Sequence, residues 1–453
     1  MAMERWCVIG GGALGLTLAH RLAGEGREVT ILEASDRLGG LADAWEIGGV
    51  HWDRHYHVTL LSDGNLRALL AELGLEDALE WRKTRTDFFT GGQFHPLNNA
   101  LDYLRFPPLG LLDKMRLAGT ILYASRIEDG RGLERIPVET WLLKLSGRRT
   151  YEAIWRPLLR AKLGENYRQA SAAFIWAIIR RMYAARRSGL KTEMFGYVAG
   201  GYARVFERFE AVLRAKGVIC NVRTPVTAVR RAEGALLVRT PAGESAYDRV
   251  AVTVAGPLAA RMCQDISAGE KAALSNVLYQ GIICPSLLLK RPLRGAYLTY
   301  IADEKIPFTA VIEMSALVDS AQFGGCSLAY LPRYVRSDDP MFEETDQSIE
   351  DRFISALTRM YPEVARPDIL SVKVSRVRQV LAVATLNYSD RLPPMKMSVP
   401  GLFVVNSAHI VNGTLNVNET VKLANEAIPM LLQPSVERAH TTGSLNVALD
   451  TAP

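Results

Sequence analysis

A short apolar run that ends in three glycines, "RWCVIGGGALG", lies at the start of the chain and constrains its fold more than any other segment. Gly10, Gly12 and Gly15 have the spacing G-x-G-x-x-G, which permits a tight turn, close approach of the backbone to a pyrophosphate, and close packing of a helix on a strand. The residues before the glycines read as a buried strand, and "ALGLTLAHRLAGEG" has apolar residues at helical spacing. A strand, a glycine loop and a helix in this order predict a dinucleotide-binding α/β fold.

A second predicted strand, "REVTILE", ends at Glu33, about 20 residues after the glycines. A carboxylate at this position accepts hydrogen bonds from a ribose 2′-hydroxyl and disfavours a 2′-phosphate. The unpaired N–H groups and the positive dipole end of the preceding helix would face the phosphates. The alternative is a glycine-rich turn that binds no ligand, and Glu33 disfavours it.

The length of 453 residues predicts two domains, and 48% hydrophobic with 23% charged residues is ordinary for a folded protein. The five cysteines have no C-x-x-C spacing, which argues against a disulfide framework and a structural zinc site and favours a reducing cytoplasm. We find no apolar run of about 18 residues, so no membrane-spanning helix is expected. The N-terminus also lacks the cleavage region of a signal peptide.

The residues after the second strand, "EASDRLGGLADAW", point to a particular cofactor. Glu33, Arg37, Gly39 and Gly40 resemble the E-x-x-x-R-x-G-G extension of flavoproteins in the amine oxidase, protoporphyrinogen oxidase and phytoene desaturase superfamily. The segments "LDYLRFPPLGLLDKMRL" and "IWRPLLRAKLGE" are most similar to bacterial protoporphyrinogen-oxidase-like proteins. In that superfamily this loop wraps the FAD pyrophosphate, so the resemblance implies FAD rather than NAD.

The resemblance implies an α/β fold, in which a Rossmann-like FAD-binding domain of the glutathione-reductase type carries an inserted α+β substrate domain. Apolar residues at helical spacing between residues 64 and 187 predict a helical region within the substrate domain. The implied boundaries are 1–60, 200–266 and 395–433 for the discontinuous FAD-binding domain, 61–199 and 267–394 for the substrate-binding domain, and 434–453 for a flexible tail.

Further FAD contacts are implied by the same resemblance. They are Val226 near the adenine, Ser407 near the pyrophosphate, and Asn416, Val417 and Asn418 near the flavin carbonyl. The last helix would point its N-terminus at the flavin pyrimidine ring, which becomes anionic on reduction. The family pattern is broken at Asn406, where a glycine is usual, and at Ala408, where an acid is usual. Another group must therefore replace that carboxylate.

The segment "HWDRHYH" contains three of the seven histidines, His51, His55 and His57. Histidine titrates near neutral pH and serves as acid, base or metal ligand, but the aromatic residues here indicate a strand or loop rather than a metal-binding helix face. In the superfamily this loop lies against the isoalloxazine ring, and UDP-galactopyranose mutases have a histidine-containing loop at a similar place. His55 and His57 are therefore the candidate catalytic residues, with histidines hydrogen-bonded within the fold as the alternative.

Two features bear on the substrate. Many amine oxidases place a lysine on a substrate-domain strand, and in this chain that position falls near Cys284, which lowers the odds of an amine oxidase. Arg156, Arg160 and Lys162 belong to a predicted helix, on which Arg156 and Arg160 share a face. Guanidinium groups bind phosphates bidentately, so these residues are candidates for an anionic substrate, with a solvated helix face as the alternative.

The resemblance implies an FAD-dependent oxidoreductase that takes hydride from a carbon or nitrogen of a small molecule, anionic or lipid-like, onto flavin N5. A redox-neutral mutase or isomerase acting on a phosphorylated or nucleotide-linked substrate, and a flavin-binding protein without turnover, are the alternatives. Nucleic-acid binding is not expected, because the net charge is +6 and acids are interspersed with the basic residues. We expect a cytoplasmic protein, with peripheral membrane contact through "YLRFPPLGLLDKMRLAGTILYA" left open against a buried helix pair.

Overall fold

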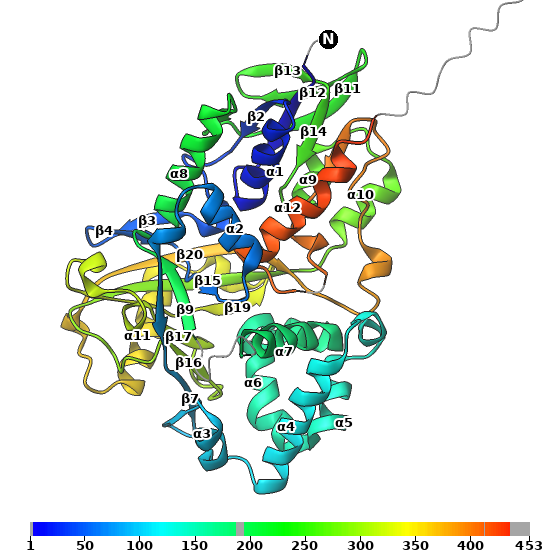
Figure 1. The fold of residues 1–453 in the computed structure, drawn as a ribbon. Helices are drawn as coiled ribbons and strands as arrows, with labels where there is room; N and C mark the ends of the chain where they lie inside the picture. Colours follow the sequence, from blue (N-terminus) through cyan, green and yellow to red (C-terminus); the bar gives the residue numbers. More distant parts are fainter. Residues whose placement is uncertain (1–2, 187–193, 412, 435–453) are drawn as a thin grey trace, which may run out of the picture.

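The computed structural model describes residues 3–186, 194–411 and 413–434. Figure 1 shows three stacked regions, which are a parallel sheet with its helices, a second and larger sheet, and a group of helices beyond it. The tail predicted for 434–453 lies, apart from its first residue, outside the described residues. Within the described residues, no helix is long and apolar enough to cross a membrane.

The parallel sheet has the strand order β10-β2-β1-β14-β21. β1 and β2 are buried at four of their five residues, as strands covered on both faces must be. The strands are β1 (Arg5–Ile9), β2 (Glu28–Leu32), β10 (Ile219–Asn221), β14 (Arg249–Val252) and β21 (Leu402–Val404). The third strand to join this sheet is about 190 residues from the second, so the region is assembled from distant parts of the chain.

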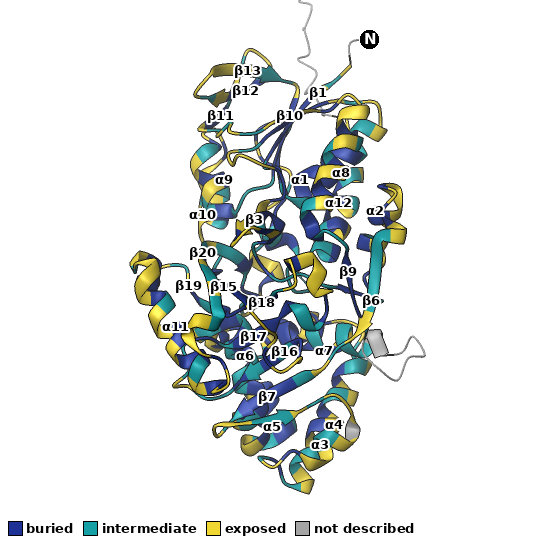
Figure 2. Ribbon diagram, turned by 90° about the vertical axis from the view of Figure 1, so that its left-hand side faces the viewer, coloured by how far each residue is buried: buried dark blue, intermediate teal, exposed yellow. Residues whose placement is uncertain are grey.

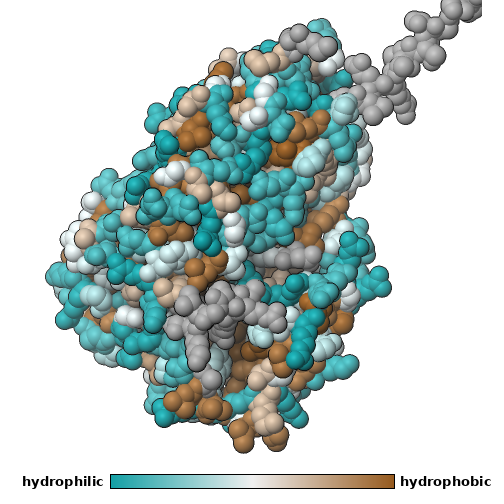
Figure 3. Space-filling model, viewed as in Figure 1, coloured by the Kyte–Doolittle hydropathy of each residue, from teal (hydrophilic) through white to brown (hydrophobic). Residues whose placement is uncertain are grey.

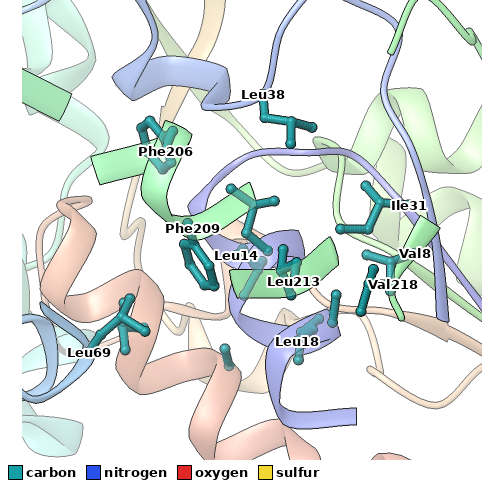
Figure 4. Packing of buried hydrophobic residues seen from close by; sticks show 14 of the residues in the cluster. Val8, Leu14, Leu18, Ile31, Leu38, Leu69, Phe206, Phe209, Leu213 and Val218 are labelled. Atoms are coloured by element: carbon teal, nitrogen blue, oxygen red, sulfur yellow. The ribbon is translucent and has the colours of Figure 1, made fainter. Parts of the chain in front are cut away.

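Three helices pack on this sheet, α1 (Ala13–Gly24), α8 (Gly201–Ala215) and α12 (Val417–Leu431), and α8 and α12 each contact α1 (Figure 2). In Figure 4, Leu14 and Leu18 of α1 lie against Phe209 and Leu213 of α8. α8 has a strongly amphipathic sequence, and the apolar face that its spacing predicts is the buried one. The glycine loop before α1 is thus anchored by a helix from the middle of the chain and one from its end.

An antiparallel meander follows β10, with β11 (Ala228–Ala232), β12 (Ala235–Thr240) and β13 (Gly243–Tyr247). After β14, two short helices, α9 (Gly256–Met262) and α10 (Ala268–Ser275), lead to the second sheet. The alternating short β-rich runs and Gly or Pro turns predicted strands and hairpins here, and the structure has them.

The second sheet has the order β19-β15-β18-β17-β16-β7-β8, and β20 pairs with β15 as a branch. Its strands are β7 (Thr86–Thr90), β8 (Gln93–Pro96), β15 (Tyr279–Leu289), β16 (Leu298–Ile301), β17 (Ala310–Glu313), β18 (Ser327–Tyr330), β19 (Arg333–Arg336) and β20 (Ile369–Ala382). All eleven residues of β15 are buried, so this strand forms the core of the sheet. α11 (Asp346–Met360) packs on it with an apolar face.

Two small sheets connect the regions. β3 (Ala44–Ile47) and β4 (Val50–Asp53) form a hairpin, and β9 (Met194–Val198) pairs with β5 (Thr59–Leu60) and β6 (Leu79–Lys83). α2 (Gly64–Glu72) lies between them in sequence and packs on α12. The loop that joins β4 to β5, residues 54–58, contains the predicted catalytic histidines.

Five helices form the remaining region, α3 (Ala100–Arg105), α4 (Leu111–Arg126), α5 (Val138–Thr150), α6 (Arg156–Leu163) and α7 (Ala172–Arg186). They enclose their own apolar core of tryptophan, phenylalanine and leucine side chains. α5 and α6 are joined by a π-helical turn over Tyr151–Trp155. α5 has a kink at Gly147, whose φ is +79°.

The buried Arg249 joins the first strand, the fourth strand and the last helix of the parallel sheet. Its Nε lies 2.6 Å from Glu4 Oε1, and its Nη1 donates to the carbonyl oxygens of Leu431 and Gln433 at 2.5 and 2.8 Å. Only 7% of its side chain is exposed, so a replacement leaves two carbonyl oxygens without their donor and removes the ion pair with Glu4.

We expect Arg249→Met to lower the free energy of unfolding by about 3 kcal/mol, because it breaks a buried ion pair from one side. Urea unfolding followed by tryptophan fluorescence measures this loss. Arg239→Met is the control, since its ion pair with Glu244 leaves 53% of the arginine side chain exposed. That variant should lose less than about 1 kcal/mol. Equal losses in the two variants would show that Arg249 has no special role.

Candidate active site

In the glycine loop between β1 and α1, neighbouring atoms lie closer to Gly10 and Gly15 than a residue with a side chain would allow. A Cβ on Gly15 would lie 1.9 Å from the carbonyl oxygen of Gly10, and a Cβ on Gly10 would lie 2.5 Å from Thr253 Oγ1. Gly10 also has φ +107°, a conformation that L side chains rarely adopt. Gly12 is the N-cap of α1, and no side chain caps this helix end. Its first N–H groups are therefore left for a ligand.

Glu33 lies directly beside this loop, at the end of β2. Its Oε2 accepts from the N–H of Gly11 at 2.6 Å, and its Oε1 accepts from the N–H and hydroxyl of Ser35, both at 2.8 Å. The carboxylate is half-buried, so it is oriented by the backbone and still reachable. The segment that contains Val226 runs alongside, because Thr224 N–H donates to the carbonyl oxygen of Glu33 at 2.8 Å.

The second pair of glycines closes over the first. Gly39 N–H donates to Gly11 O at 2.9 Å, and Gly40 has φ +59° with its Cβ position 3.1 Å from Gly12 Cα. Arg37 reaches across this crossing, where its Nη1 donates to Ala44 O at 3.0 Å. The two loops contact each other through glycine backbone alone. The space beside them, which we call the glycine cradle, is open to a phosphate chain because no side chain fills it.

These observations fit a dinucleotide cofactor. The uncapped helix N-terminus would offer its N–H groups to the phosphates, the carboxylate of Glu33 would accept from a ribose hydroxyl, and glycines line the space between these two groups. At the other end of the site, Asn416 caps α12 by accepting from Glu419 N–H at 3.0 Å. The side chain of Asn418 turns away to α2, where its Oδ1 accepts from Leu66 N–H at 3.1 Å. Val417 begins α12, so the backbone N–H groups of 417 and 418 are the ones this helix can offer to a flavin.

The departure at residues 406–408 is explained by buried hydrogen bonds. Asn406 donates from Nδ2 to Val254 O at 3.0 Å and accepts from Ala408 N–H at 3.0 Å, so it joins the ends of β21 and β14. His409 is also buried, and its Nε2 lies 3.1 Å from Pro393 O. Burial lowers the pKa of His409. The sequence identified Asn406 only as a departure from the family pattern and did not single out His409, because their hydrogen-bond partners lie elsewhere along the chain. Ser407 is half-buried beside them.

His55 joins the cofactor region to the second sheet. Its Nδ1 lies 3.2 Å from Leu41 O, and its Nε2 lies 3.0 Å from Ser375 Oγ of β20. Both ring nitrogens are thus engaged, with Nδ1–H donating and Nε2 accepting from the hydroxyl. Burial lowers the pKa of His55 to about 4, so the ring is neutral at physiological pH. This arrangement matches the alternative considered for this residue, a histidine hydrogen-bonded within the fold.

His57 differs from His55 in having an unsatisfied nitrogen. Among the described residues, its buried Nδ1 has no hydrogen-bond partner and lies 3.7 Å from Asp53 Oδ2. The ring packs on Tyr202 at 5.0 Å between centroids, in a small cavity. Asp53 is held in place by the N–H of Tyr202 at 2.8 Å. An unsatisfied nitrogen beside a fixed carboxylate distinguishes His57 from His55, and the catalytic role of His57 stays a prediction.

Cys284 is buried in β15 and pairs in register with Ser375 of β20, the partner of His55. Burial raises the pKa of the Cys284 thiol, so it is not a nucleophile at neutral pH. Cys284, the position aligned with the lysine of amine oxidases, thus lies on the strand next to the one that contacts His55, and its thiol is unreactive.

A lysine from another element lies near the same loop. Lys162 of α6 places its Nζ 5.5 Å from the ring centroid of Tyr56 and 5.4 Å from that of Tyr334. The two tyrosine hydroxyls are 3.2 Å apart, which ties the loop to β19. Lys162 has no carboxylate partner among the described residues. Lys162 lies on a different face of α6 from Arg156 and Arg160, because it follows Arg160 by two residues, which is about half a helical turn.

Arg156 and Arg160 line a cavity of about 280 Å³ between α6 and the second sheet, and Tyr334 forms part of its wall. The cavity is lined by four arginines and five carboxylates. Arg160 pairs with Glu304 at 2.7 Å and with Glu165 at 3.0 Å. The two arginines share a face as predicted, but their charge is balanced by these acids. Their role in binding an anion stays a prediction.

Comparison with known proteins decides the family. Residues 15–418 match the family model described as flavin containing amine oxidoreductase. The chain belongs to this family. The predicted superfamily, the fold class with its Rossmann-like FAD-binding part, and the FAD cofactor are thereby confirmed.

Two curated relatives differ in the activity that their names give. The coproporphyrinogen III oxidase of Mycobacterium tuberculosis is 39% identical over 101 residues, which are 21% of this chain and 22% of that protein. A protein of Synechococcus elongatus named as a zeta-carotene desaturase is 24% identical over 253 residues, 51% of this chain and 52% of the relative. The chain thus matches about a fifth of the length of the first relatives.

Solved structures share the fold over nearly the whole chain. A protein of Exiguobacterium sp. 255-15 described as a protoporphyrinogen oxidase has a TM-score of 0.76 at 20% identity, covering 95% of this chain and 99% of its own. Putrescine oxidase bound to putrescine has a TM-score of 0.72 at 16% identity, covering 95% and 100%. Reduced UDP-galactopyranose mutase has 0.69 at 14%, covering 95% of each chain. At these identities the likeness shows the fold alone.

The glycine cradle can be tested by adding one methyl group. We expect Gly15→Ala to raise the Kd for FAD at least about tenfold, because its Cβ must push the Gly10 carbonyl out of the loop. Titration of the apoprotein with FAD, followed by flavin fluorescence, measures this change. Gly24→Ala in the same helix is the control, since its Cβ would meet nothing within 4 Å. Unchanged affinity in the first variant would contradict the cradle.

The depressed pKa of His55 predicts a loss of stability in acid. Between the unfolded pKa of about 6.5 and the folded value of about 4, the unfolded chain binds a proton that the folded chain does not. Acidification therefore favours unfolding, and His55 should contribute a loss of about 2 kcal/mol between pH 7 and pH 5.

Urea unfolding of the wild type and of His55→Gln at the two pH values measures the contribution of His55 to the pH dependence of the free energy of unfolding. His20 and His409 also have lowered pKa values and shift both proteins alike. An equal pH dependence in the two proteins would show that His55 is not held neutral.

Proposed function

We propose that this protein is an FAD-dependent dehydrogenase that introduces a double bond into an apolar-bodied, carboxylate-bearing small molecule. The observation that carries the proposal is the position of Lys162, a cation without a carboxylate partner among the described residues, over Tyr56 and Tyr334. A cation stacked between two aromatic faces beside the cofactor loop suits a carboxylate and repels an ammonium group. This favours an anionic substrate over a polyamine.

The chain's own residues would position the reactants. FAD supplies the two-electron acceptor, onto which the substrate's hydride passes. Lys162 would bind the carboxylate, and the tyrosine pair would orient the apolar body. His55 would hold the loop to the second sheet without titrating, and His57 beside Asp53 would take the proton that the substrate loses with the hydride.

The substrate class is supported by the relatives. Coproporphyrinogen III, the substrate named in the 39% identical relatives, is a tetrapyrrole with several carboxylates, and its oxidation removes hydrogen from ring and bridge atoms. The carotene named in the desaturase relative is oxidised in the same sense but bears no charge for Lys162 to bind. We therefore propose a substrate of the first kind.

The five free cysteines support a cytoplasmic location.

A redox-neutral mutase is the second candidate, and the unsatisfied nitrogen of His57 in the histidine loop is what favours it. The two functions differ in the oxidation state of FAD that they require. Addition of candidate substrates without oxygen, to the oxidised protein and to the dithionite-reduced protein, separates them. Bleaching of oxidised FAD by substrate would support the dehydrogenase, whereas product formation only after reduction, without a net change of the flavin, would support the mutase.

We expect Lys162→Met to raise the KM for coproporphyrinogen III at least about tenfold while kcat changes little, since a charged hydrogen bond to substrate contributes about 1.5 to 3 kcal/mol. The measurement is anaerobic bleaching of the flavin at several substrate concentrations. Putrescine, a dication, should not bleach the wild type.

Lys144→Met on α5 is the matched control, because this lysine is exposed and has no ion pair among the described residues. Its KM should equal that of the wild type. Bleaching by putrescine but not by coproporphyrinogen III would overturn the proposed substrate class, while leaving the flavin site intact.

A further inference from the structure

Large apolar side chains gather on one end of the molecule. Of the twelve large hydrophobic residues that are exposed among the described residues, seven belong to α3 and α4, although these helices are a small part of the chain. The seven are Leu101, Leu104, Leu111, Leu112, Met115, Leu122 and Tyr123, and we call them the α3–α4 surface. Apolar colour gathers at this end of the space-filling view in Figure 3. Patches of this kind mark interaction sites in folded proteins.

The spacing of these residues gives the surface a single orientation. Leu111, Met115 and Leu122 recur at intervals of four and seven, so they form one stripe along α4. The opposite face of α4, with Leu117, Thr120 and Ala124, is buried in the core of the helical region. α4 is therefore apolar on two sides, and only one side has a partner within the described chain.

The corner between α3 and α4 is firmly built. Phe106 and Leu109 of "RFPPLG" are 1% and 3% exposed, while Leu111 and Leu112 directly after them are both 69% exposed. Lys114 Nζ donates to Leu104 O at 2.6 Å, and Arg149 Nε donates to Pro108 O at 3.0 Å. The leucines are thus held outward by a corner that has its own buried anchors.

Basic groups border the apolar residues. Residues 100–126 contain four basic side chains, Arg105, Lys114, Arg116 and Arg126, against two acidic ones, Asp102 and Asp113. Arg105, Arg116 and Arg126 are exposed and have no ion pair among the described residues. An excess of free positive charge around an apolar face complements a surface that is apolar inside and negative outside.

We propose that the α3–α4 surface docks this protein on an anionic lipid bilayer. The leucines and Met115 would enter the boundary between headgroups and acyl chains, and the arginines would contact lipid phosphates. The contact is peripheral, because no described helix is long and apolar enough to cross a membrane. The net positive charge of the face disfavours a second copy of the same face as its partner, since like charges would meet.

The test is co-sedimentation of the FAD-loaded full chain with vesicles. Vesicles of phosphatidylcholine with phosphatidylglycerol should bind it at least about tenfold more tightly than vesicles of phosphatidylcholine alone. The triple variant Leu111→Ser, Leu112→Ser and Met115→Ser should bind the anionic vesicles at least about tenfold more weakly. The double variant Arg105→Gln and Arg116→Gln should lose most of the preference for anionic lipid.

The control carries the same kind of change elsewhere. Leu258 and Leu370 are 40% and 47% exposed and lie outside this surface, so their replacement by serine should leave vesicle binding unchanged. The flavin absorbance of each variant shows whether the fold is intact.

Three results would overturn the proposal. The first is wild-type binding to both kinds of vesicle with equal affinity, and the second is unchanged binding by the triple variant with its flavin spectrum intact. The third is a dimer of the wild type in sedimentation velocity that the triple variant dissociates, because the surface would then join two copies of the chain.

Discussion

The close approach of the Gly10 carbonyl to Gly15 within the glycine loop is the contact on which the rest of the site depends. Gly15 admits the Gly10 carbonyl only because it has no Cβ, and this contact sets the direction in which α1 leaves β1. Helices from the middle and the end of the chain then pack on α1, so the cofactor region is held by three distant segments. A ligand at the uncapped end of α1 therefore touches a part of the molecule whose position the whole parallel sheet determines.

The loop at residues 54–58 connects the cofactor region to the second sheet. His55 bonds to the glycine-loop segment on one side and to β20 on the other, and Tyr56 bonds to Tyr334 of β19. His55 is neutral and hydrogen-bonded at both ring nitrogens, and neither hydrogen bond changes with protonation at physiological pH. The loop is therefore fixed to both of its partners. The second sheet and the glycine cradle are thus set relative to one another by a few polar contacts, and Lys162 of the helical region contacts the same loop through Tyr56.

The local elements followed from the sequence wherever one short pattern determines them. The glycine loop, Glu33, the amphipathic α8 and the helices between residues 64 and 186 needed only spacing and burial of apolar faces. The π-helical turn at Tyr151–Trp155 was not predicted, because tertiary packing of its aromatic residues selects it over a regular helix. Asn406 and His409 were missed as buried connectors, since their partners Val254 and Pro393 are far from them or lie in loops without a pattern.

The sequence by itself determined the fold class and the cofactor, and it predicted the residues for the phosphates, because these inferences depend on glycines and a carboxylate at fixed short separations. Only the tertiary structure decided which titratable groups are free. His55 and His57 are two residues apart, yet one is bonded at both nitrogens and the other is not. Lys162 and Arg160 are equally close, yet one faces tyrosines and the other faces acids. Ser375, the two tyrosines and Glu304 are each more than a hundred residues from the side chain that they contact, and local sequence cannot specify which distant residues folding brings together.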